Sequence, residues 1–380
     1  KYSLVEEEIK KEIKKSNDQL NILNYYIQIL EDSKELISGY LGNDKFGIDD
    51  VNKIETEDEK LIRAKTIYKD FESYGYTKEY LNEGIEQYND FINFHFNVEF
   101  NGRTANDDIY DINDTNYGDS NINNIKDSES HSTHVSGIIS GDRHNNDGNK
   151  GINNLVEIMV LRAIPNGDEY DKDVARAIRY AVDNGARIIN GSFGKYFSSN
   201  PEWVIDAIRY ASDNDVLVIA AAGNESKNLD SLSNDNYPSD QFFNKNEFSN
   251  TFIKVGASSI DLNENFTAYF SNYGKVNVDI FAPGVDIYSS VPNNKYKFQS
   301  GTSMASPVVS GIASLIMSYF PKLSAKKVKE IILESGIDID IKIGNLGGNK
   351  HFREYSKSGK LVNAYNALIL ASRSKRKWLL

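Results

Sequence analysis

Cysteine is absent from this chain of 380 residues, which excludes disulfide bonds and thiol chemistry. Positive charge is in deficit as well: a formal net charge of −12 leaves no basic face of the kind that nucleic acids require. Long apolar runs are also missing, and no stretch approaches the roughly 18 residues that a bilayer-crossing helix needs. We therefore expect neither nucleic-acid partners nor a transmembrane segment, and the lack of cysteine suits a bacterial cell-envelope or secreted protein.

The first 90 residues combine charged stretches with apolar residues that are mostly three or four positions apart, among them Ile9, Ile13, Leu20, Leu23 and Ile27. This spacing predicts amphipathic helices. Residues 16–19 predict the start of a second helix, residues 42–44 predict a break, and a helical pattern resumes over 57–73. A solvated helical bundle without chemistry explains the region, and a partner-binding or propeptide-like role is the alternative.

From residue 131 onward, helical patterns and apolar strands alternate. Helices are predicted at 131–141, 171–184, 202–213, 303–319 and 324–335, and strands at 156–162, 187–191, 216–222, 252–257 and 276–281. This alternation predicts an α/β fold, with a mainly parallel sheet covered by helices on both faces. Active sites in such sheets lie at the carboxyl ends of strands, where Ser192 and Asn224 both fall.

Ser303 stands between a turn and an apolar helical run, within the segment 301–307, Gly-Thr-Ser-Met-Ala-Ser-Pro. A helix N-terminus offers unpaired N–H groups and the positive end of a dipole to a developing anion. A serine at this place also has an ordinary explanation as a helix N-cap. The whole segment, however, resembles the nucleophile motif of the subtilisin-like serine proteases, the subtilase or S8-type peptidases. By this resemblance Ser303 is the nucleophile.

Two further motifs follow the order of that family. The segment 131–137, His-Ser-Thr-His-Val-Ser-Gly, resembles the helix that carries the general base, which places the base at His131. The segment 219–225, Ile-Ala-Ala-Ala-Gly-Asn-Glu, resembles the strand end whose Asn amide binds the oxyanion, which places that donor at Asn224. Histidine titrates near neutral pH and can take the proton of a serine that attacks. His134 is expected to be structural.

The segment 188–194, Ile-Ile-Asn-Gly-Ser-Phe-Gly, resembles the substrate-binding strand of the family. The resemblance implies that Ser192, Phe193 and Gly194 pair with the backbone of a peptide, as an added strand. The segment 270–274, Phe-Ser-Asn-Tyr-Gly, also resembles a family segment. Three acidic residues after the predicted strand 156–162 are expected to favour basic side chains in the substrate: Asp168, Glu169 and Asp171.

The resemblance covers roughly residues 90–370 and implies a three-layer subtilisin-like fold with an accessory region ahead of it. Residues 1–90 resemble the helical insertion that precedes the His motif in some subtilases of Bacteroidetes. Residues 91–380 are then the catalytic domain.

Two departures from the family pattern concern the base. The catalytic Asp of the family ends a buried apolar strand ahead of the His helix, and no such strand pattern precedes His131. Asp114 is a superficial candidate, in an Asn/Asp-rich stretch that is typical of a loop. We therefore expect the catalytic Asp on an N-terminal segment or fragment outside this chain. Ser132 stands where the family usually has Gly, and we expect it to perturb the base modestly.

The resemblance implies a serine endopeptidase that works through an acyl-enzyme, with Asn224 and the N–H of Ser303 as oxyanion donors. Its partners are polypeptide substrates, and its location is the outside of the cell or the bacterial cell envelope. No cofactor is required, and structural calcium is an option for the loops. The alternative is a catalytically impaired scaffold that binds peptides or a protein partner, which the missing Asp and Ser132 favour.

Overall fold

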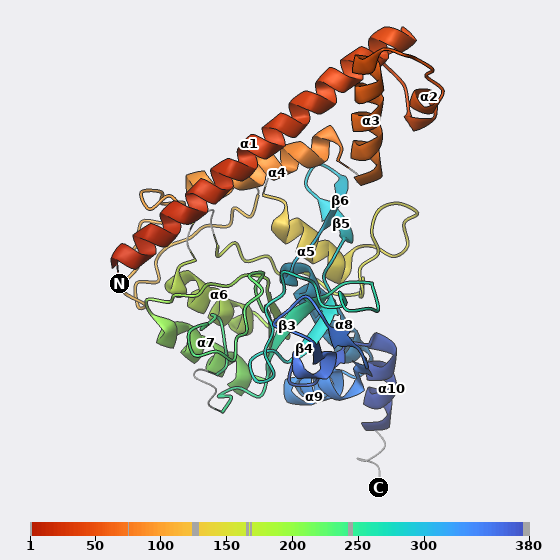
Figure 1. Cartoon of the computed structure of the whole chain (residues 1–380). Helices are drawn as coiled ribbons and strands as arrows, with labels where there is room; N and C mark the ends of the chain where they lie inside the picture. The colour runs from red at the N-terminus through yellow and green to blue at the C-terminus, as the bar shows by residue number, and fades with distance from the viewer. Residues whose placement is uncertain are drawn as a thin grey trace. The chain divides into compact units, whose positions relative to one another are not determined.

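The computed structural model describes residues 2–74, 76–123, 129–164, 167, 169–241 and 246–374 of the chain. Its backbone separates into two compact units (Figure 1). The first comprises Lys1–Thr104 with Pro165–Asp168, and the second comprises Ala105–Ile164 with Glu169–Leu380. Each unit has a hydrophobic core of its own.

The first unit is helical. Its elements are α1 (Tyr2–Leu41), α2 (Ile48–Asn52), α3 (Glu59–Tyr74), α4 (Lys78–Asp90) and a π-helical turn, η1 (Phe91–His95). Both α3 and α4 pack against α1. The core that they share includes Leu30, Ile37, Leu61 and Leu81. The amphipathic spacing of the sequence thus corresponds to helices that bury one face against each other.

The predicted helix start at residues 16–19 is wrong, because α1 runs through them without a break. Ser16 is buried, and the side chain of Asn17 donates to the carbonyl oxygen of Ile13 at 2.8 Å. An asparagine side chain can thus satisfy its hydrogen bond within a helix, by bonding to the preceding turn, and does not have to mark the start of a helix. The predicted break is correct, since α1 ends at Leu41 and Gly42 has a φ of 63°, which suits glycine.

The second unit is built on a sheet of six strands in the order β1-β2-β3-β4-β10-β7. The strands are β1 (Ile188–Gly191), β2 (Leu217–Ala221), β3 (Phe252–Ser258), β4 (Ile280–Pro283), β10 (Lys360–Leu361) and β7 (Ile337–Asp338). The first five run parallel, and β7 is antiparallel to β10. The register sets Ile188 opposite Leu217, and Val218 opposite Phe252.

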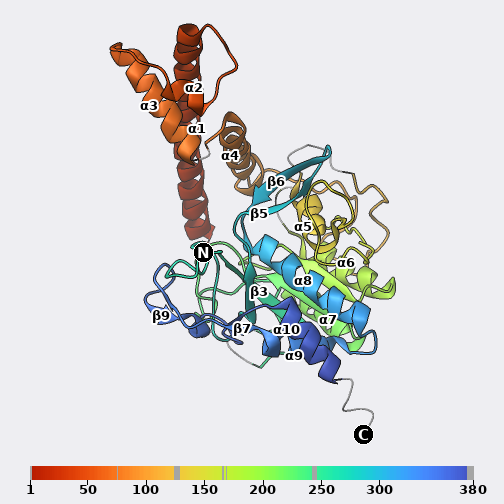
Figure 2. The same ribbon diagram turned by 90° about the vertical axis from the view of Figure 1, so that its right-hand side faces the viewer.

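Helices cover both faces of this sheet, which explains why its central strands are continuous apolar runs. Val218 and Ala220 of β2 lie in one core with α6 (Asp171–Asp183) and α7 (Pro201–Asp213). Their neighbours Leu217 and Ile219 lie in a second core with α8 (Thr302–Tyr319), α9 (Ala325–Ser335) and α10 (Ala364–Ser374). Figure 2 shows α8 and α9 in front of the strands. The predicted three-layer α/β fold is confirmed.

The remaining elements of this unit are short. They are α5 (His131–Ser140), the hairpin of β5 (Ile287–Val291) and β6 (Lys295–Gln299), the pair β8 (Lys342–Ile343) and β9 (Lys350–His351), and a 3₁₀ turn, η2 (Phe352–Glu354). The predicted strand at 156–162 is wrong: these residues form no strand, and Ile158 and Met159 are exposed. No strand among the described residues pairs with this segment, and an unpaired segment forms no ladder. No helix in the described part of the chain is long and apolar enough to cross a membrane.

Candidate active site

Ser303 is the second residue of α8, directly after the start of the helix. Its Oγ donates to the carbonyl oxygen of Ser192 at 3.2 Å, and Ser192 Oγ donates to the carbonyl oxygen of Ser303 at 2.8 Å. The head of α8 is therefore joined to the segment that follows β1. The N–H of Ser303 belongs to the first helical turn, where N–H groups have no acceptor within the helix.

Asn224 lies in the turn after β2, and its side chain is oriented by Thr302. Its Oδ1 accepts from the N–H of Thr302 at 2.9 Å and from the Thr302 hydroxyl at 3.0 Å. The same hydroxyl accepts from the N–H of Gly223 at 3.0 Å. Because the amide oxygen faces these donors, the Nδ2 group of Asn224 is turned to the other side, where no described residue accepts a hydrogen bond from it.

Two N–H donors border the same space beside Gly301. A Cβ atom built on Gly301 would lie 3.5 Å from Nδ2 of Asn224 and 3.6 Å from the backbone nitrogen of Ser303. A side chain at this position would therefore fill the space between the donors, and glycine leaves it open. Donors that are fixed in advance around one point can stabilise negative charge that develops on an oxygen there.

His131 is the first residue of α5, a helix that packs against α8. Val135, one turn after His131, shares a buried cluster with Met304, the residue after Ser303. Helix α5 packs along α8. The structure thus brings the N-terminal ends of these two helices together, although about 170 residues separate them in the sequence.

The surroundings of His131 lower the pKa of its ring and so favour the neutral form. Ser130, just before it, accepts from Nε2 of Gln299 at 3.3 Å, which ties the start of α5 to the segment that leads into α8. His131 is exposed, yet the protein atoms around the ring hinder its hydration, and this desolvation lowers its pKa. The neighbouring His134 lowers the pKa further. A neutral imidazole is the form that accepts a proton.

His134 is fully buried, and its Nε2 lies 3.1 Å from the carbonyl oxygen of Lys297 in β6. Burial lowers its pKa. The carbonyl oxygen of His134 also accepts from the hydroxyl of Ser289 at 2.7 Å, in β5. His134 therefore joins α5 to the β5–β6 hairpin, which is the structural place that its spacing from His131 predicts.

No carboxylate is among the groups that shift the pKa of His131, and His131 makes no ion pair in the described part of the chain. Asp114, the candidate of the sequence analysis, accepts instead from the N–H of Asp108 at 2.9 Å and closes a turn of its own loop. No strand precedes α5 among the described residues.

Residues 192–194 follow β1 at its carboxyl end, as predicted. Phe193 packs against the core beneath α6 and α7. The N–H of Gly194 donates to Oε1 of Glu169 at 3.2 Å. A Cβ atom on Gly194 would approach the carbonyl oxygen of Tyr237 to 3.0 Å, so that the Tyr237 loop borders the segment closely. The carboxylate of Glu169 thus accepts a hydrogen bond from an N–H group that could otherwise pair with a peptide strand.

The other acidic residues expected near the substrate differ from Glu169. Asp168 lies outside the described residues. Asp171 is buried, lies 3.0 Å from Nζ of Lys195 and accepts the N–H of Asn200 at 2.9 Å. Its charge is therefore compensated within the protein.

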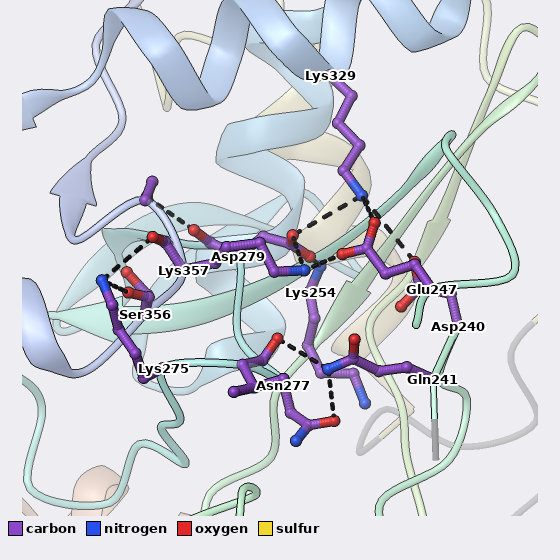
Figure 3. A network of polar contacts seen from close by, with 12 residues as sticks. Asp240, Gln241, Glu247, Lys254, Lys275, Asn277, Asp279, Lys329, Ser356 and Lys357 are labelled. Atoms are coloured by element: carbon purple, nitrogen blue, oxygen red, sulfur yellow. Dashed lines mark hydrogen bonds and ion pairs between the residues drawn. The ribbon is translucent and has the colours of Figure 1, made fainter. Parts of the chain in front are cut away.

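A cluster of charged side chains is buried between β3, α9 and the loops beside β4 (Figure 3). The backbone N–H of Lys254 donates to Asp279 at 2.7 Å, and Lys329 lies 3.0 Å from Glu247 and 3.8 Å from Asp279. Burial and the nearby Asp279 raise the pKa of Asp240 to about 7. Burial lowers the pKa of Lys254 to about 8.

This buried cluster supports the loop that borders residues 192–194. The ammonium group of Lys254 donates to Oδ1 of Asn236 at 2.7 Å and to its carbonyl oxygen at 3.2 Å. The next residue, Tyr237, forms an antiparallel bridge with Lys195, which follows Gly194. The position of the loop against residues 192–194 therefore depends on buried charge.

Serines recur every four residues along α8 and bond to two asparagines; they are Ser306, Ser310, Ser314 and Ser318. The first two donate to Oδ1 of Asn190, at 2.8 and 2.9 Å. The last two accept from Nδ2 of Asn153, at 3.2 and 3.0 Å. We call this series the serine row.

Three residues around the site carry no separate signal in the sequence: Thr302, Asn190 and Asn272. Thr302 orients Asn224, Asn190 bonds to α8, and Asn272 bonds to the turn after β2. Each lies within a segment that resembles the family, so neighbourhood in such a segment is the signal that could identify them.

A family model described as "Subtilase family" matches residues 48–358. Over 234 residues the chain is 35% identical to a cell wall-associated protease of Bacillus subtilis, covering 61% of this chain and 24% of that protein. Over 210 residues it is 38% identical to a thermophilic serine proteinase of Bacillus sp. (strain AK1), covering 55% of this chain and 46% of that protein. The chain thus spans about a quarter to a half of the length of these curated relatives.

Solved structures agree with this family. A protease from Pseudoalteromonas arctica aligns with a TM-score of 0.52 at 25% identity, over 63% of this chain and 70% of that one. A variant of the protease domain of PatA aligns with a TM-score of 0.50 at 25% identity, over 64% of this chain and 81% of that one. Because the family match spans most of the sequence and includes α5, β2 and α8, this chain belongs to the subtilase family.

Proposed function

We propose that this chain is a serine endopeptidase, in which Ser303 attacks the carbonyl carbon of a peptide bond. The observation that carries the proposal is the pair of N–H donors, Asn224 Nδ2 and Ser303 N, that border one space beside Gly301. The names of the relatives, which include proteases of two Bacillus species, support the same reaction.

His131 is the proposed base. As Ser303 Oγ forms a bond to the carbonyl carbon, its proton passes to the imidazole, and the carbonyl oxygen takes up negative charge between the two donors. The C–N bond then breaks, and His131 returns the proton to the leaving amine. A water molecule repeats the sequence on the acyl-enzyme and releases the second product. The proposed reaction uses no cofactor. Structural calcium in the loops stays a prediction. Among the described residues, no group of three or more His, Cys, Asp or Glu residues could hold a metal ion.

A third group that orients His131 belongs to the proposal. Among the described residues no carboxylate bonds to this ring, so we propose that the orienting Asp comes from outside them. Polypeptides are the proposed substrates, with their backbone paired to residues 192–194, where the carboxylate of Glu169 would have to leave the N–H of Gly194. We propose that the helical region of residues 1–90 is an accessory insertion and that residues 91–380 form a catalytic domain. The name of the Bacillus subtilis relative supports a cell-envelope or secreted location.

A fluorophosphonate probe tests the proposal directly, because it labels only an activated serine. We expect stoichiometric labelling of the chain, mapped to Ser303 by mass spectrometry. The variant Ser303→Ala should lose all labelling and all cleavage of an unfolded polypeptide. Ser372→Ala, which removes an exposed hydroxyl on α10, is the matched control and should keep both. Folded protein that is not labelled would instead favour the non-catalytic peptide-binding scaffold.

A further inference from the structure

Asn272 lies in the loop between β3 and β4, and its side chain is fully buried against the turn that carries Asn224. Its Oδ1 accepts from the N–H of Lys227 at 2.7 Å and from the N–H of Glu225 at 3.3 Å. Two backbone donors that follow Asn224 are thus held by one oxygen. An acceptor side chain that serves two N–H groups in this way fixes the course of a turn.

The other half of the Asn272 carboxamide holds the residues ahead of Asn224. Its Nδ2 donates to the carbonyl oxygen of Ala222 at 2.7 Å, and its backbone N–H donates to the carbonyl oxygen of Gly223 at 2.9 Å. One residue therefore bonds to the backbone on both sides of Asn224. Leaving a buried polar group without a partner costs free energy of folding. Other paths of the loop would break these bonds, so the bonds favour the one path that is observed.

The turn needs such support because its backbone is unusual. Gly223 has a φ of 99°, and Ser226 has a φ of 57° although it is not glycine. Residues with positive φ persist where their surroundings hold them. A Cβ atom on Gly223 would lie 2.4 Å from Nδ2 of Asn272, so the carboxamide fills the space beside the turn.

Asn272 also joins this turn to the segment after β1. Its Nδ2 lies 2.6 Å from the hydroxyl of Tyr196 and 2.9 Å from Oε2 of Glu225, and Tyr196 donates to the same carboxylate. Nζ of Lys227 lies 3.7 Å above the Tyr196 ring. Tyr196 follows residues 192–194 by two positions, so the turn that carries Asn224 and the segment after β1 both bond to this one buried amide.

We infer that Asn272 is a positioning residue that keeps Nδ2 of Asn224 directed at the oxyanion. The inference rests on the proposed function. Asn272 makes no hydrogen bond to Ser303; it acts through the turn and through Asn224, whose Oδ1 remains on the N–H of Thr302 only while the turn keeps its path.

A double-mutant cycle tests the inference, with kcat and KM measured for wild type, Asn272→Ala, Asn224→Ala and the double variant. Deleting one oxyanion donor commonly lowers kcat by about 10²–10³-fold, and a donor that is displaced should cost less, about 10–100-fold for Asn272→Ala, with KM little changed. In the Asn224→Ala background, Asn272→Ala should change kcat by less than about 3-fold. Independent, additive losses in the two backgrounds would overturn the inference.

Asn345→Ala is the matched control for lost stability. Asn345 also bridges a loop with two hydrogen bonds, at 2.9 and 2.7 Å to Thr267, away from the turn. It should lower the unfolding temperature while kcat stays unchanged; an equal loss of kcat in Asn345→Ala would overturn the inference.

Hydrogen exchange gives a second readout that needs no activity. Amides of residues 222–227 should exchange faster in Asn272→Ala than in wild type and in Asn345→Ala. Unchanged exchange there would overturn the inference even in an active enzyme. If wild type neither cleaves nor takes up the fluorophosphonate, the proposed function fails, while exchange still decides whether Asn272 holds the turn.

Discussion

The buried carboxyl group of Asp240 should make the stability of this protein fall as the pH rises toward neutrality. Burial is the main reason that its pKa rises from 3.8 to about 7, and the nearby Asp279 adds to it. Between these two values the folded state binds a proton that the unfolded state has lost, so the free energy of unfolding decreases with increasing pH. The stabilisation is complete below pH 3.8 and is lost as the pH passes about 7.

The size of the effect follows from the shift in pKa. About three pKa units at 1.36 kcal/mol each set a ceiling of ~4 kcal/mol on the change across this range. The pKa of about 7 already includes the charge of Lys329, whose Nζ is 4.0 Å from Asp240 and which favours the carboxylate. The variant Asp240→Asn keeps the shape of the side chain and cannot ionise, so it should lack this part of the pH dependence.

Urea unfolding of both proteins at several pH values between 4 and 8 measures the effect. Placing both in the Ser303→Ala background prevents self-digestion during the experiment. The stability of wild type relative to Asp240→Asn should fall steadily from pH 4 to pH 7. Asp206→Asn is the matched control, because Asp206 is an exposed residue of α7 that pairs with Arg209 one turn away. A difference that is flat or that rises with pH would refute the reasoning.

Two further predictions concern α5. In Gly137→Ala, the new Cβ would lie 2.4 Å from the hydroxyls of Ser289 and Ser290, and we expect a loss of about 1–3 kcal/mol in unfolding free energy together with lower activity. Gly39→Ala in α1, where a Cβ meets nothing within 4 Å, should not destabilise, and equal losses in both variants would contradict the packing argument. For the chain without the orienting Asp proposed above, whose charge would raise the pKa of His131, desolvation should keep kcat/KM constant as the pH falls through 6.5; an acid limb with its midpoint above 6.5 would contradict this.

The layers of the second unit could be predicted because their signals are local. Leu217 to Ala221 form an uninterrupted apolar run, as a strand that is covered on both faces requires. Ser324 indicates the start of the helix at 324–335. As an N-cap, its side chain accepts a hydrogen bond from the N–H of Lys327 at 3.2 Å. Such patterns need no knowledge of distant residues.

The segment 156–162 shows why other features could not be predicted. Its apolar residues fit a strand, but a strand forms only beside a partner, and pairing is a property of the whole sheet. The burial of the charged cluster could not be predicted for the same reason, because it also depends on contacts between distant residues. Asp240, Lys254 and Asp279 look like surface residues in a sequence, because nothing nearby indicates that the fold will bury them together.

Part of the candidate site could be predicted from the sequence. The motifs around His131, Asn224 and Ser303 indicate residues that the fold brings to neighbouring helix and strand ends. The residues that support the site could not be predicted in this way, because about 45 residues of sequence separate Asn272 from the turn that it holds. Which amide bonds to which backbone group depends on loop paths that residue types alone do not determine.

The serine row gives α8 a fixed rotation about its own axis. Hydrogen bonds weaken steeply when their angles become poor, so they resist rotation of the helix. Asn190 and Asn153 grip the helix at two heights, so a small turn would strain all of these bonds at once. The orientation of Ser303 about the helix axis thus depends on these polar contacts as well as on apolar packing. Exchanging these serines for larger apolar residues would add apolar burial and remove the hydrogen bonds that help to orient the proposed nucleophile.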